Sequence, residues 1–200
     1  MERIRRLVLA SSNRGKLEEI REVLADTGIE LIAQSEFGID DVEETGTTFV
    51  ENALIKARHA TRLSGLPALG DDSGLCVDSL GGAPGLCSAR YSGVHGDTTA
   101  NIAKLLDVMK GIPESERGAH FHCTLVVLRS ADDPAPLIAE GRWHGRVLET
   151  PRGTKGFGYN PVFLDLDLGL SAAEIDTDVK NRVSHRGKAL KRLREMLPEL

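Results

Sequence analysis

The stretch HFHCTLVVLRS, residues 120–130, decides the fold class, because it is the strongest strand signal in the chain. Its β-branched and aromatic residues form a near-continuous run, and such residues favour strands. The segment LIAEGRWHGRVLE, residues 137–149, follows closely and predicts a partner strand. These two segments therefore predict a pair of adjacent strands in the second half of the chain.

Upstream of this pair, strands alternate with helices. Residues 7–11 predict a short buried strand, which is followed by a helix that stops by Gly28. A second strand is predicted at residues 29–34. Thr48 and Glu51 have the spacing of a capping box and open a second long helix. Helices alternating early with strands, and adjacent strands late, indicate an α/β protein with a mixed sheet flanked by helices.

The remaining elements are weaker signals. Residues 67–78 predict a strand, a tight turn and a second extended piece. Thr98 is expected to cap a third helix. Residues 153–161 are too rich in Gly and Pro for a helix or strand, and residues 162–164 are expected to return to the sheet. Ser184 is expected to cap the last helix.

Composition excludes several classes of protein. The 200 residues are 40% hydrophobic and 4% aromatic, with a net charge of −5, which disfavours a nucleic-acid-coating protein. No apolar run is long enough for a membrane span or a signal peptide. The three cysteines match no disulfide or zinc spacing and favour a reducing, cytoplasmic setting. No repeat or linker divides the sequence, so residues 1–200 are predicted to form one domain.

Cations gather at two predicted helix starts, where the helix dipole disfavours them. Arg14 and Lys16 lie in the first helix, and His185 and Arg186 lie in the last. The pattern predicts polyanion binding at both starts, with backbone N–H groups and side-chain cations converging on phosphate oxygens. The alternative interpretation is that these are solvated surface charges. Residues 11–16 (SSNRGK) also lie where a strand gives way to a helix, although they lack the P-loop pattern.

Carboxylates supply the complementary half of such a site. Glu43 and Glu44 lie in an acidic stretch, and Asp71 and Asp72 lie where a turn is predicted. Mg²⁺ prefers one or two carboxylates together with substrate phosphates, and a carboxylate beside the metal is able to activate water. The alternative is that the aspartates are ordinary turn residues.

The segment GFGYNP, residues 156–161, places an aromatic ring and an amide between glycines. Glycine lets the backbone approach a ligand closely, and the ring of Phe157 offers a face to a nucleobase. Asn160 adds a hydrogen-bonding group. The alternative is a structural turn in which Phe157 and Tyr159 are simply buried.

Taken together and in order, these segments resemble the inosine/xanthosine triphosphate pyrophosphatase family (Ham1-like), which hydrolyses non-canonical purine nucleoside triphosphates. The similarity covers nearly the whole chain. It rests on LASSNRGKLEEI (9–20), EETGTTFVENALIKARHA (43–60), DDSGLCVDSLGGAPGLCSARYSG (71–93), GFGYNPVF (156–163) and SHRGKAL (184–190). The resemblance implies an elongated mixed sheet of the anticodon-binding-domain-like type, two lobes with a central cleft, and a homodimer.

The resemblance also implies a reaction and its residues. Inosine, deoxyinosine and xanthosine triphosphates would be hydrolysed to the monophosphate and pyrophosphate with Mg²⁺, which cleanses the nucleotide pool. Glu44 and Asp72 would serve the metal, Asp72 would activate water, and Lys56 would neutralise triphosphate charge. Substrate would be bound by Ser11, Ser12, Asn13, Arg14, Gly15, Lys16, Ser73, Phe157, Gly158, Tyr159, Asn160, Lys180, His185 and Arg186.

Two departures bear on the base. Asn160 stands where the family commonly has Asp, and Lys155 replaces a usual Gly. Asn both donates and accepts hydrogen bonds, whereas an ionised Asp only accepts, so base preference is expected to differ. Two alternatives stay open, namely a related pyrophosphatase for other modified or ordinary triphosphates and a nucleotide-binding module without turnover.

Overall fold

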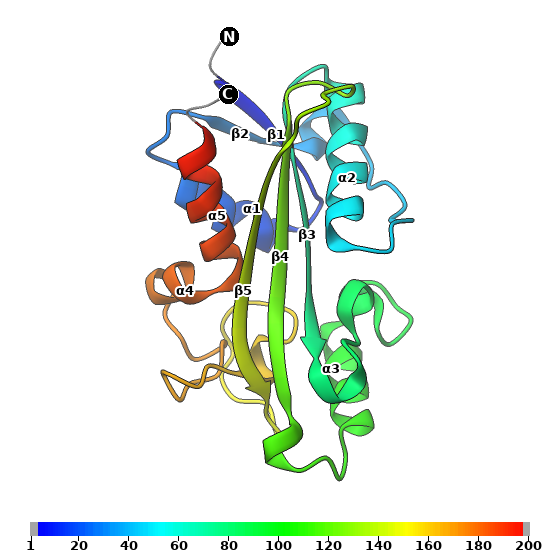
Figure 1. The fold of residues 1–200 in the computed structure, drawn as a ribbon, viewed down its shortest axis with the longest axis vertical. Helices are drawn as coiled ribbons and strands as arrows, with labels where there is room; N and C mark the ends of the chain where they lie inside the picture. Colours follow the sequence, from blue (N-terminus) through cyan, green and yellow to red (C-terminus); the bar gives the residue numbers. More distant parts are fainter. Residues whose placement is uncertain (1–3, 198–200) are drawn as a thin grey trace. The chain divides into compact units, whose positions relative to one another are not determined.

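The computed structural model describes residues 4–197 (Figure 1), and its strands confirm the predicted mixed sheet. Within that range six strands form one sheet in the order β2–β1–β3–β4–β5–β6. Strand β1 runs parallel to β2 and β3, whereas β5 and β6 are antiparallel. The strands are β1 (Arg6–Ala10), β2 (Glu30–Ala33), β3 (Ala68–Val77), β4 (Gly118–Leu128), β5 (Leu137–Val147) and β6 (Phe163–Leu164).

The α-helices flank this sheet, and all but α4 begin close to their predicted starts. They are α1 (Arg14–Leu24), α2 (Phe49–Ser64), α3 (Thr98–Val108), α4 (Thr177–Val183) and α5 (His185–Met196). The capping box at the start of α2 is confirmed, because Thr48 accepts from the Glu51 N–H and Glu51 reaches back to Thr48. Gly65 ends α2 with a left-handed φ of 70°, as its lack of a side chain permits.

The chain divides into two compact units. The first comprises Met1–Asp72, Cys123–Gly141 and Arg186–Leu200, and the second comprises Ser73–His122 and Arg142–His185. The divisions fall within β3, β4, β5 and the first turn of α5. Each unit is described by itself below, and the single-domain organisation stays a prediction.

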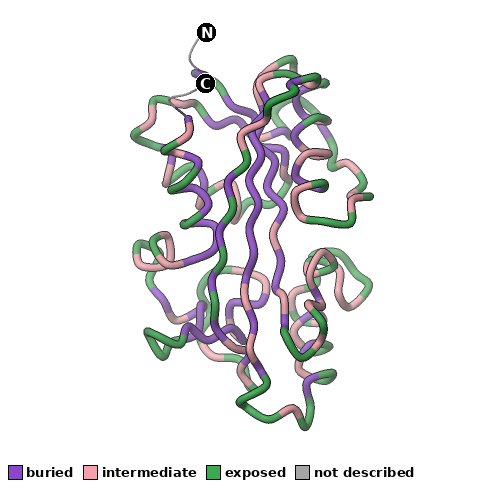
Figure 2. The backbone as a smooth tube through the Cα atoms, in the orientation of Figure 1, coloured by how far each residue is buried: buried purple, intermediate pink, exposed green. Residues whose placement is uncertain are grey.

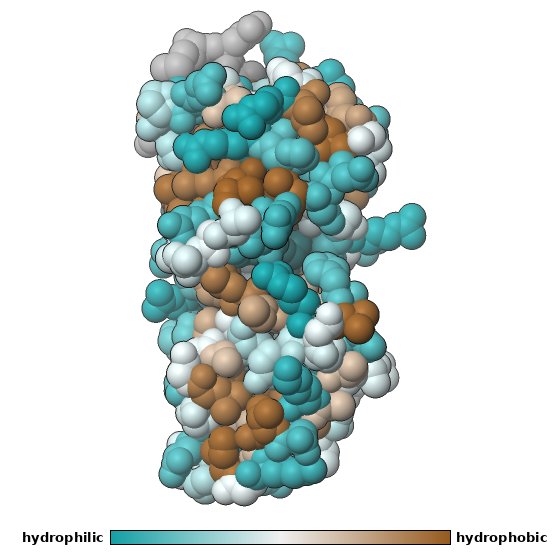
Figure 3. Space-filling model, turned by 90° about the vertical axis from the view of Figure 1, so that its right-hand side faces the viewer, coloured by the Kyte–Doolittle hydropathy of each residue, from teal (hydrophilic) through white to brown (hydrophobic). Residues whose placement is uncertain are grey.

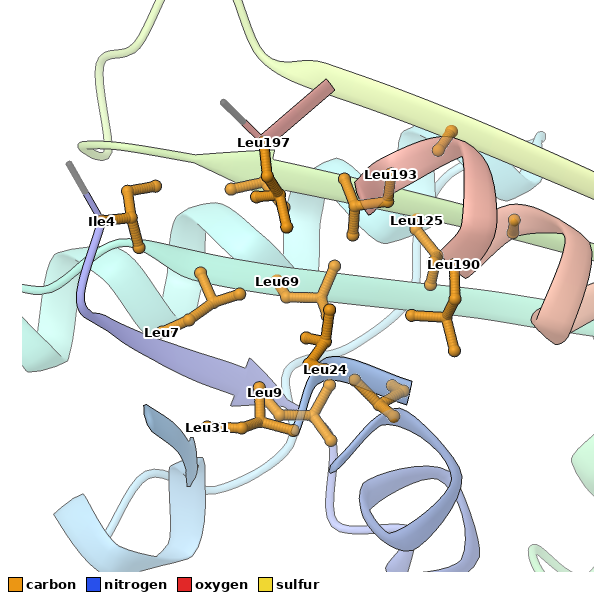
Figure 4. Close-up of a cluster of buried hydrophobic side chains, with 14 of the residues drawn as sticks. Ile4, Leu7, Leu9, Leu24, Leu31, Leu69, Leu125, Leu190, Leu193 and Leu197 are labelled. Carbon is orange, nitrogen blue, oxygen red and sulfur yellow. The ribbon is translucent and has the colours of Figure 1, made fainter. Parts of the chain in front are cut away.

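The first unit packs helices on both faces of its part of the sheet. Leu7 and Leu9 of β1 contact the cluster formed with α1 and α5, to which Leu190 of α5 belongs (Figure 4). The intervening Val8 packs instead with Ala60 of α2. Because successive strand side chains point to opposite faces, this alternation buries β1 on both faces from Leu7 to Ala10. The continuous apolar run read from the sequence is thereby explained.

The second unit has an aromatic core. Phe121 of β4 lies 4.6 Å from Phe163 of β6 and 6.2 Å from Trp143 of β5, measured between ring centroids. Leu105 of α3 and Met109, which directly follows that helix, are both fully buried in this core. Strands β3 and β4 are largely buried and β5 alternates between buried and exposed residues, whereas the connecting loops are largely exposed (Figure 2).

Two expectations about local structure were wrong, and one helix was missed. The turn predicted at Asp71 and Asp72 is absent, because β3 continues without interruption from Ala68 to Val77. The two aspartates stay extended because each is buried against cationic side chains, which outweighs their preference for turns. The cap of α3 is Asp97, which accepts from the Ala100 N–H, one residue before the expected Thr98. Helix α4 was not predicted at all.

On the face shown in Figure 3, small groups of apolar residues lie among hydrophilic ones. Leu63 of α2 and Val108 of α3 are among those exposed. Single exposed apolar side chains are ordinary on protein surfaces. Among the described helices, none combines the length and apolar character that crossing a membrane demands.

Candidate active site

The predicted phosphate segment forms the entry to α1. Asn13 is the N-cap and accepts from the Lys16 N–H at 3.1 Å, and Ser11 Oγ accepts from the Asn13 N–H at 3.2 Å. Ser12 donates to a carboxylate oxygen of Asp41. No acidic residue lies in the first turn of α1. No carboxylate in this turn therefore neutralises the partial positive charge of the helix start, which leaves that charge to attract an anion.

Behind this segment, a buried carboxylate holds two cations. Lys16 Nζ lies 2.6 Å from Asp71 Oδ1, and Arg186 Nε donates to Asp71 Oδ2 at 2.8 Å. Arg186 also donates to Glu19 through Nη1 at 2.5 Å. Burial works against the ionised form of Asp71, but Arg186 and Lys16 outweigh it and hold its pKa well below the usual value. The cations at the two helix starts thus converge on Asp71 within the first unit.

Helix α2 lies close enough to β3 to place side chains on Asp72. A Cβ at Gly70 of β3 would fall 2.1 Å from the carbonyl oxygen of Ala53 and 3.2 Å from the amide nitrogen of Ala57. Glycine on the strand and alanines on the helix therefore permit a backbone-to-backbone approach that larger residues would prevent. This approach brings Asn52 and Lys56, which are one helical turn apart, onto the same carboxylate.

Lys56 joins the two predicted metal ligands. Its Nζ lies 2.8 Å from both Glu44 Oε1 and Asp72 Oδ1, and Asn52 Nδ2 donates to Asp72 Oδ2 at 3.3 Å. Burial raises the pKa of Asp72 more than Lys56 lowers it. Burial lowers the pKa of Lys56, but Asp72 and Glu44 outweigh that effect and leave it raised. The result is a half-buried cluster in which two carboxylates lie within reach of one ammonium group.

The donor set of this cluster fits Mg²⁺. Glu44 and Asp72 offer hard carboxylate oxygens, the ligands that Mg²⁺ takes one or two at a time from proteins. Within residues 4–197 no three His, Cys, Asp or Glu side chains gather as a complete protein-only metal site. Phosphate and water oxygens would therefore complete the coordination, as is usual for Mg²⁺ in nucleotide enzymes.

The predicted base residues gather in the second unit, around the loop before β6. Lys180 Nζ of α4 lies 5.5 Å from the ring centroid of Phe157, a cation–π distance. A Cβ at Gly156 would meet Asn160 Nδ2 at 2.1 Å and Lys180 Nζ at 3.3 Å, so both polar groups adjoin this glycine. Asn160 Nδ2 is buried and has no hydrogen-bond partner among the described residues. Its amide is therefore an unsatisfied donor within the described part of the chain.

Among the other predicted substrate residues, Tyr159 and His185 have structural partners. Tyr159 is buried, donates through Oη to the Ser88 carbonyl oxygen at 2.9 Å, and has its pKa raised by burial. His185 stacks on Phe121, with ring centroids 4.7 Å apart and planes 13° apart. Ser73 is half-buried in β3 and Gly158 has a φ of 61°. Tyr159 and His185 therefore help to hold the loop and the first turn of α5 in place.

The sequence is similar to that of one protein family along nearly the entire chain. Residues 7–196 match the family model of the Ham1 family. The chain belongs to the Ham1 family. A relative from Xanthomonas campestris pv. campestris, named dITP/XTP pyrophosphatase, is 61% identical over 98% of this chain and 99% of its own. A relative of the same name from Shigella flexneri is 50% identical over 97% of this chain and 98% of its own.

Solved Ham1 structures confirm the fold. A HAM1 protein from Coxiella burnetii, 48% identical, superposes with a TM-score of 0.90 and covers 98% of this chain and 99% of its own. A protein from Mycobacterium abscessus, described as nucleoside-triphosphatase / dITP/XTP pyrophosphatase, is 41% identical with a TM-score of 0.75, covering 94% and 97%. The α/β class with a mixed sheet and flanking helices, predicted above, is therefore confirmed for this Ham1 protein.

Three side chains that contact predicted site residues were missed in the sequence analysis. Asn52, Glu19 and Asp41 were given no role there, although each contacts a predicted site residue. For Asn52 the signal was available, since it precedes Lys56 by four residues on the same helix face. Glu19 and Asp41 reach residues far away in the chain, and no local pattern reveals such contacts.

Proposed function

We propose that this Ham1 protein hydrolyses non-canonical purine nucleoside triphosphates, including ITP, dITP and XTP, to the monophosphate and pyrophosphate. One observation carries the proposal, namely that Lys56 lies between the carboxylates of Glu44 and Asp72. A cation able to neutralise phosphate charge thus sits beside two oxygen ligands suited to Mg²⁺. The dITP/XTP pyrophosphatase names of relatives at 50–61% identity support the same reaction.

The phosphates are assigned to the first unit. Backbone N–H groups at the start of α1, together with Arg14 and Lys16, bind phosphate oxygens, and Ser11 and Ser12 add hydroxyl groups. When bound, Mg²⁺ supplies further neutralisation of phosphate charge at Glu44 and Asp72. Phosphoryl transfer needs little beyond positioning and charge neutralisation, and these residues provide both.

Asp72 is assigned as the base that takes a proton from the attacking water. Burial raises its pKa, which makes its carboxylate a stronger proton acceptor than a solvated one. Lys56 donates to Asp72 Oδ1 and keeps that carboxylate ionised and oriented. The proton moves from water to a carboxylate oxygen of Asp72 as the water oxygen bonds to the α phosphorus. The bond from that phosphorus to the α–β bridging oxygen breaks, and pyrophosphate leaves with the bridging oxygen.

The base is assigned to the second unit. Phe157 offers its ring for stacking, and Asn160 and Lys180 present donors beside Gly156. Purines with a keto oxygen present an acceptor to such donors, whereas adenine presents an amino group instead. This difference supports selection of hypoxanthine and xanthine over adenine. His185, Ser73, Gly158 and Tyr159 are assigned to the walls and support of this base site, whereas Arg186 of the first unit is assigned to the support of Asp71.

Product analysis tests the reaction directly. The protein is incubated with ITP and Mg²⁺, and phosphorus NMR identifies what is released. Inosine monophosphate and pyrophosphate are expected in equal amounts, and chelation of Mg²⁺ should abolish turnover. Orthophosphate without pyrophosphate would rule out the proposal. Nucleotide binding without any turnover would instead identify a non-catalytic module.

A second candidate is a pyrophosphatase for other modified or ordinary triphosphates, favoured by Asn160 at a position where Asp is usual. A panel of ITP, dITP, XTP, ATP, GTP and pyrimidine triphosphates ranks them by kcat/KM. The main proposal expects ITP, dITP and XTP to lead. The same panel on Asn160→Asp shows how much of that ranking the amide determines.

Assembly and location are also proposed. A homodimer is proposed from the family resemblance, and its mass in solution by light scattering tests it. A cytoplasmic location is proposed because Cys76, Cys87 and Cys123 are free thiols in the described structure. Fractionation of cells that express the tagged chain tests the location.

A further inference from the structure

Asn52 occupies an unusual place for an amide. It lies in the first turn and a half of α2 and is only 1% exposed, so both ends of its side chain must find hydrogen-bond partners within the protein. Its Oδ1 accepts from the Gly46 N–H at 2.8 Å, and its Nδ2 donates to Asp72 Oδ2 at 3.3 Å. The two partners require opposite ends of the amide, so they fix its orientation.

In this arrangement the two oxygens of the Asp72 carboxylate accept hydrogen bonds from two residues on one face of α2. Asn52 contacts Oδ2, and Lys56, one turn later, contacts Oδ1 at 2.8 Å. Two donors that bind different oxygens fix the plane of a carboxylate, whereas a single donor leaves the carboxylate free to rotate. Lys56 carries a charge that substrate phosphates attract, whereas the neutral amide of Asn52 keeps Asp72 as its partner.

The other end of Asn52 anchors the acidic segment. Gly46 lies two residues after Glu44, and a Cβ at Gly46 would fall 2.7 Å from Asn52 Oδ1 and 2.6 Å from Glu51 Cβ. The segment therefore lies directly against the start of α2, at a distance that only glycine permits. One amide thus connects the chain next to one proposed metal ligand with the carboxylate of the other.

We propose that Asn52 is a positioning residue that sets the orientation of Asp72 and the placement of Glu44 relative to it. The inference rests on the proposed function for the roles of those two carboxylates. Metal-binding carboxylates are commonly held by such outer hydrogen bonds, and loss of one typically costs about 10–100-fold in metal affinity or activity. Asn52 itself does not touch substrate in this assignment.

The test replaces Asn52 by Leu, which is of similar size and makes no hydrogen bond. Asn101→Leu is a matched control, because Asn101 is also buried on a helix and also bridges a loop, accepting from the Ser92 N–H at 2.7 Å and donating to the Ala89 carbonyl oxygen at 3.1 Å. Mn²⁺ serves as a paramagnetic probe, and its binding to the nucleotide-free protein is measured by electron paramagnetic resonance. Steady-state kinetics with ITP and thermal unfolding complete the set.

We expect Asn52→Leu to weaken Mn²⁺ binding and lower kcat by about 10–100-fold each, while KM stays within about threefold. Asn101→Leu should lose comparable stability but keep Mn²⁺ affinity and kcat. Should Asn52→Leu fail to fold, Gly46→Ala decides, because its Cβ forces the acidic segment away from the Asn52 amide while Asn52 itself is retained. Unchanged Mn²⁺ affinity in the folded variants, or an equal loss in Asn101→Leu, overturns the inference. A wild type that releases no pyrophosphate defeats the proposed function, and the Mn²⁺ comparison still decides the role of Asn52.

Discussion

Arg186 Nε donates to Asp71 Oδ2 at 2.8 Å across 115 residues of sequence. Both side chains are almost fully buried, and Lys16 reaches the same carboxylate from α1. A buried charge is costly unless it is paired, and here one carboxylate pairs two cations. Asp71 therefore joins the first turn of α1 to that of α5 within the first unit. Its negative charge explains why cations are tolerated at both helix starts.

Removing this carboxylate is expected to be costly. Asp71→Ala leaves Lys16 and Arg186 buried without it, and breaking a buried ion pair typically costs about 3–5 kcal/mol. Urea unfolding at pH 7 measures the change in the free energy of unfolding. The comparison variant is Asp26→Ala, which removes an ion pair to Arg194 whose side chains are 70% and 38% exposed, and which is expected to cost less than about 1 kcal/mol. Equal losses in the two variants would contradict the central role of Asp71.

Local patterns were sufficient for most of the fold. The capping box of Thr48 and Glu51 and the β-branched run of β4 are signals that lie within one segment, and both elements formed where expected. The prediction of a turn at Asp71 and Asp72 was wrong because residue type indicates only a local backbone preference. The cations that keep these residues extended come from Lys16, Lys56 and Arg186, and their approach depends on the completed fold.

Turnover is expected to depend on the Asp72 carboxylate. Asp72→Asn keeps the size of the side chain but removes the proton acceptor and one proposed metal ligand, so kcat should fall by at least about 10²–10⁴-fold. Binding of a non-hydrolysable ITP analogue, measured by calorimetry, should change much less. Glu43→Gln is the control, because Glu43 is exposed and is assigned no ligand role. Undiminished turnover in Asp72→Asn would remove Asp72 from the mechanism.

The site was only partly visible in the sequence, for a similar reason. The segment types were evident, because glycines, carboxylates and cations cluster at predicted element ends. The hydrogen bonds that orient them were not, since Asn52 acts through Gly46 and Asp72, and Asp41 acts through Ser12. Such residues touch the site indirectly, and their type alone is equally typical of ordinary caps and turns.

The base loop offers a comparison between two glycines. Gly156 has a φ of 77° and a Cβ there would lie 2.1 Å from Asn160 Nδ2, whereas Gly158 has a φ of 61° with open space around it. Gly158→Ala should cost only the left-handed backbone strain of about 1–2 kcal/mol. Gly156→Ala carries the same strain and also displaces Asn160 and Lys180, so KM for ITP should rise further than in Gly158→Ala. Steady-state kinetics and urea unfolding measure both effects, and equal KM values would argue against a base contact by Asn160.

A stability prediction concerns Asp133, which lies away from the site in the first unit. Its carboxylate accepts from Arg129 Nε and Nη2 at 2.8 Å, from the Arg129 N–H at 3.0 Å and from the Ala135 N–H at 3.0 Å. The hydrogen bonds from Arg129 are the main cause that lowers the pKa of Asp133 below its usual value. The ionised carboxylate is therefore favoured more in the folded state than in the unfolded chain.

Because the folded pKa is depressed, the stabilisation by Asp133 should be complete above its unfolded pKa of about 3.9 and should be lost as pH falls toward the folded value. Asp133→Asn should lower the free energy of unfolding by about 2 kcal/mol at pH 7, the usual contribution of charged hydrogen bonds. The difference from wild type should shrink progressively below about pH 4. Urea unfolding at pH 7, 5, 4 and 3 follows it, with Asp107→Asn as the control, since that carboxylate forms an exposed pair with Lys110. A difference that grows on acidification would show that Asp133 is bound more tightly when protonated, contrary to the hydrogen bonds described.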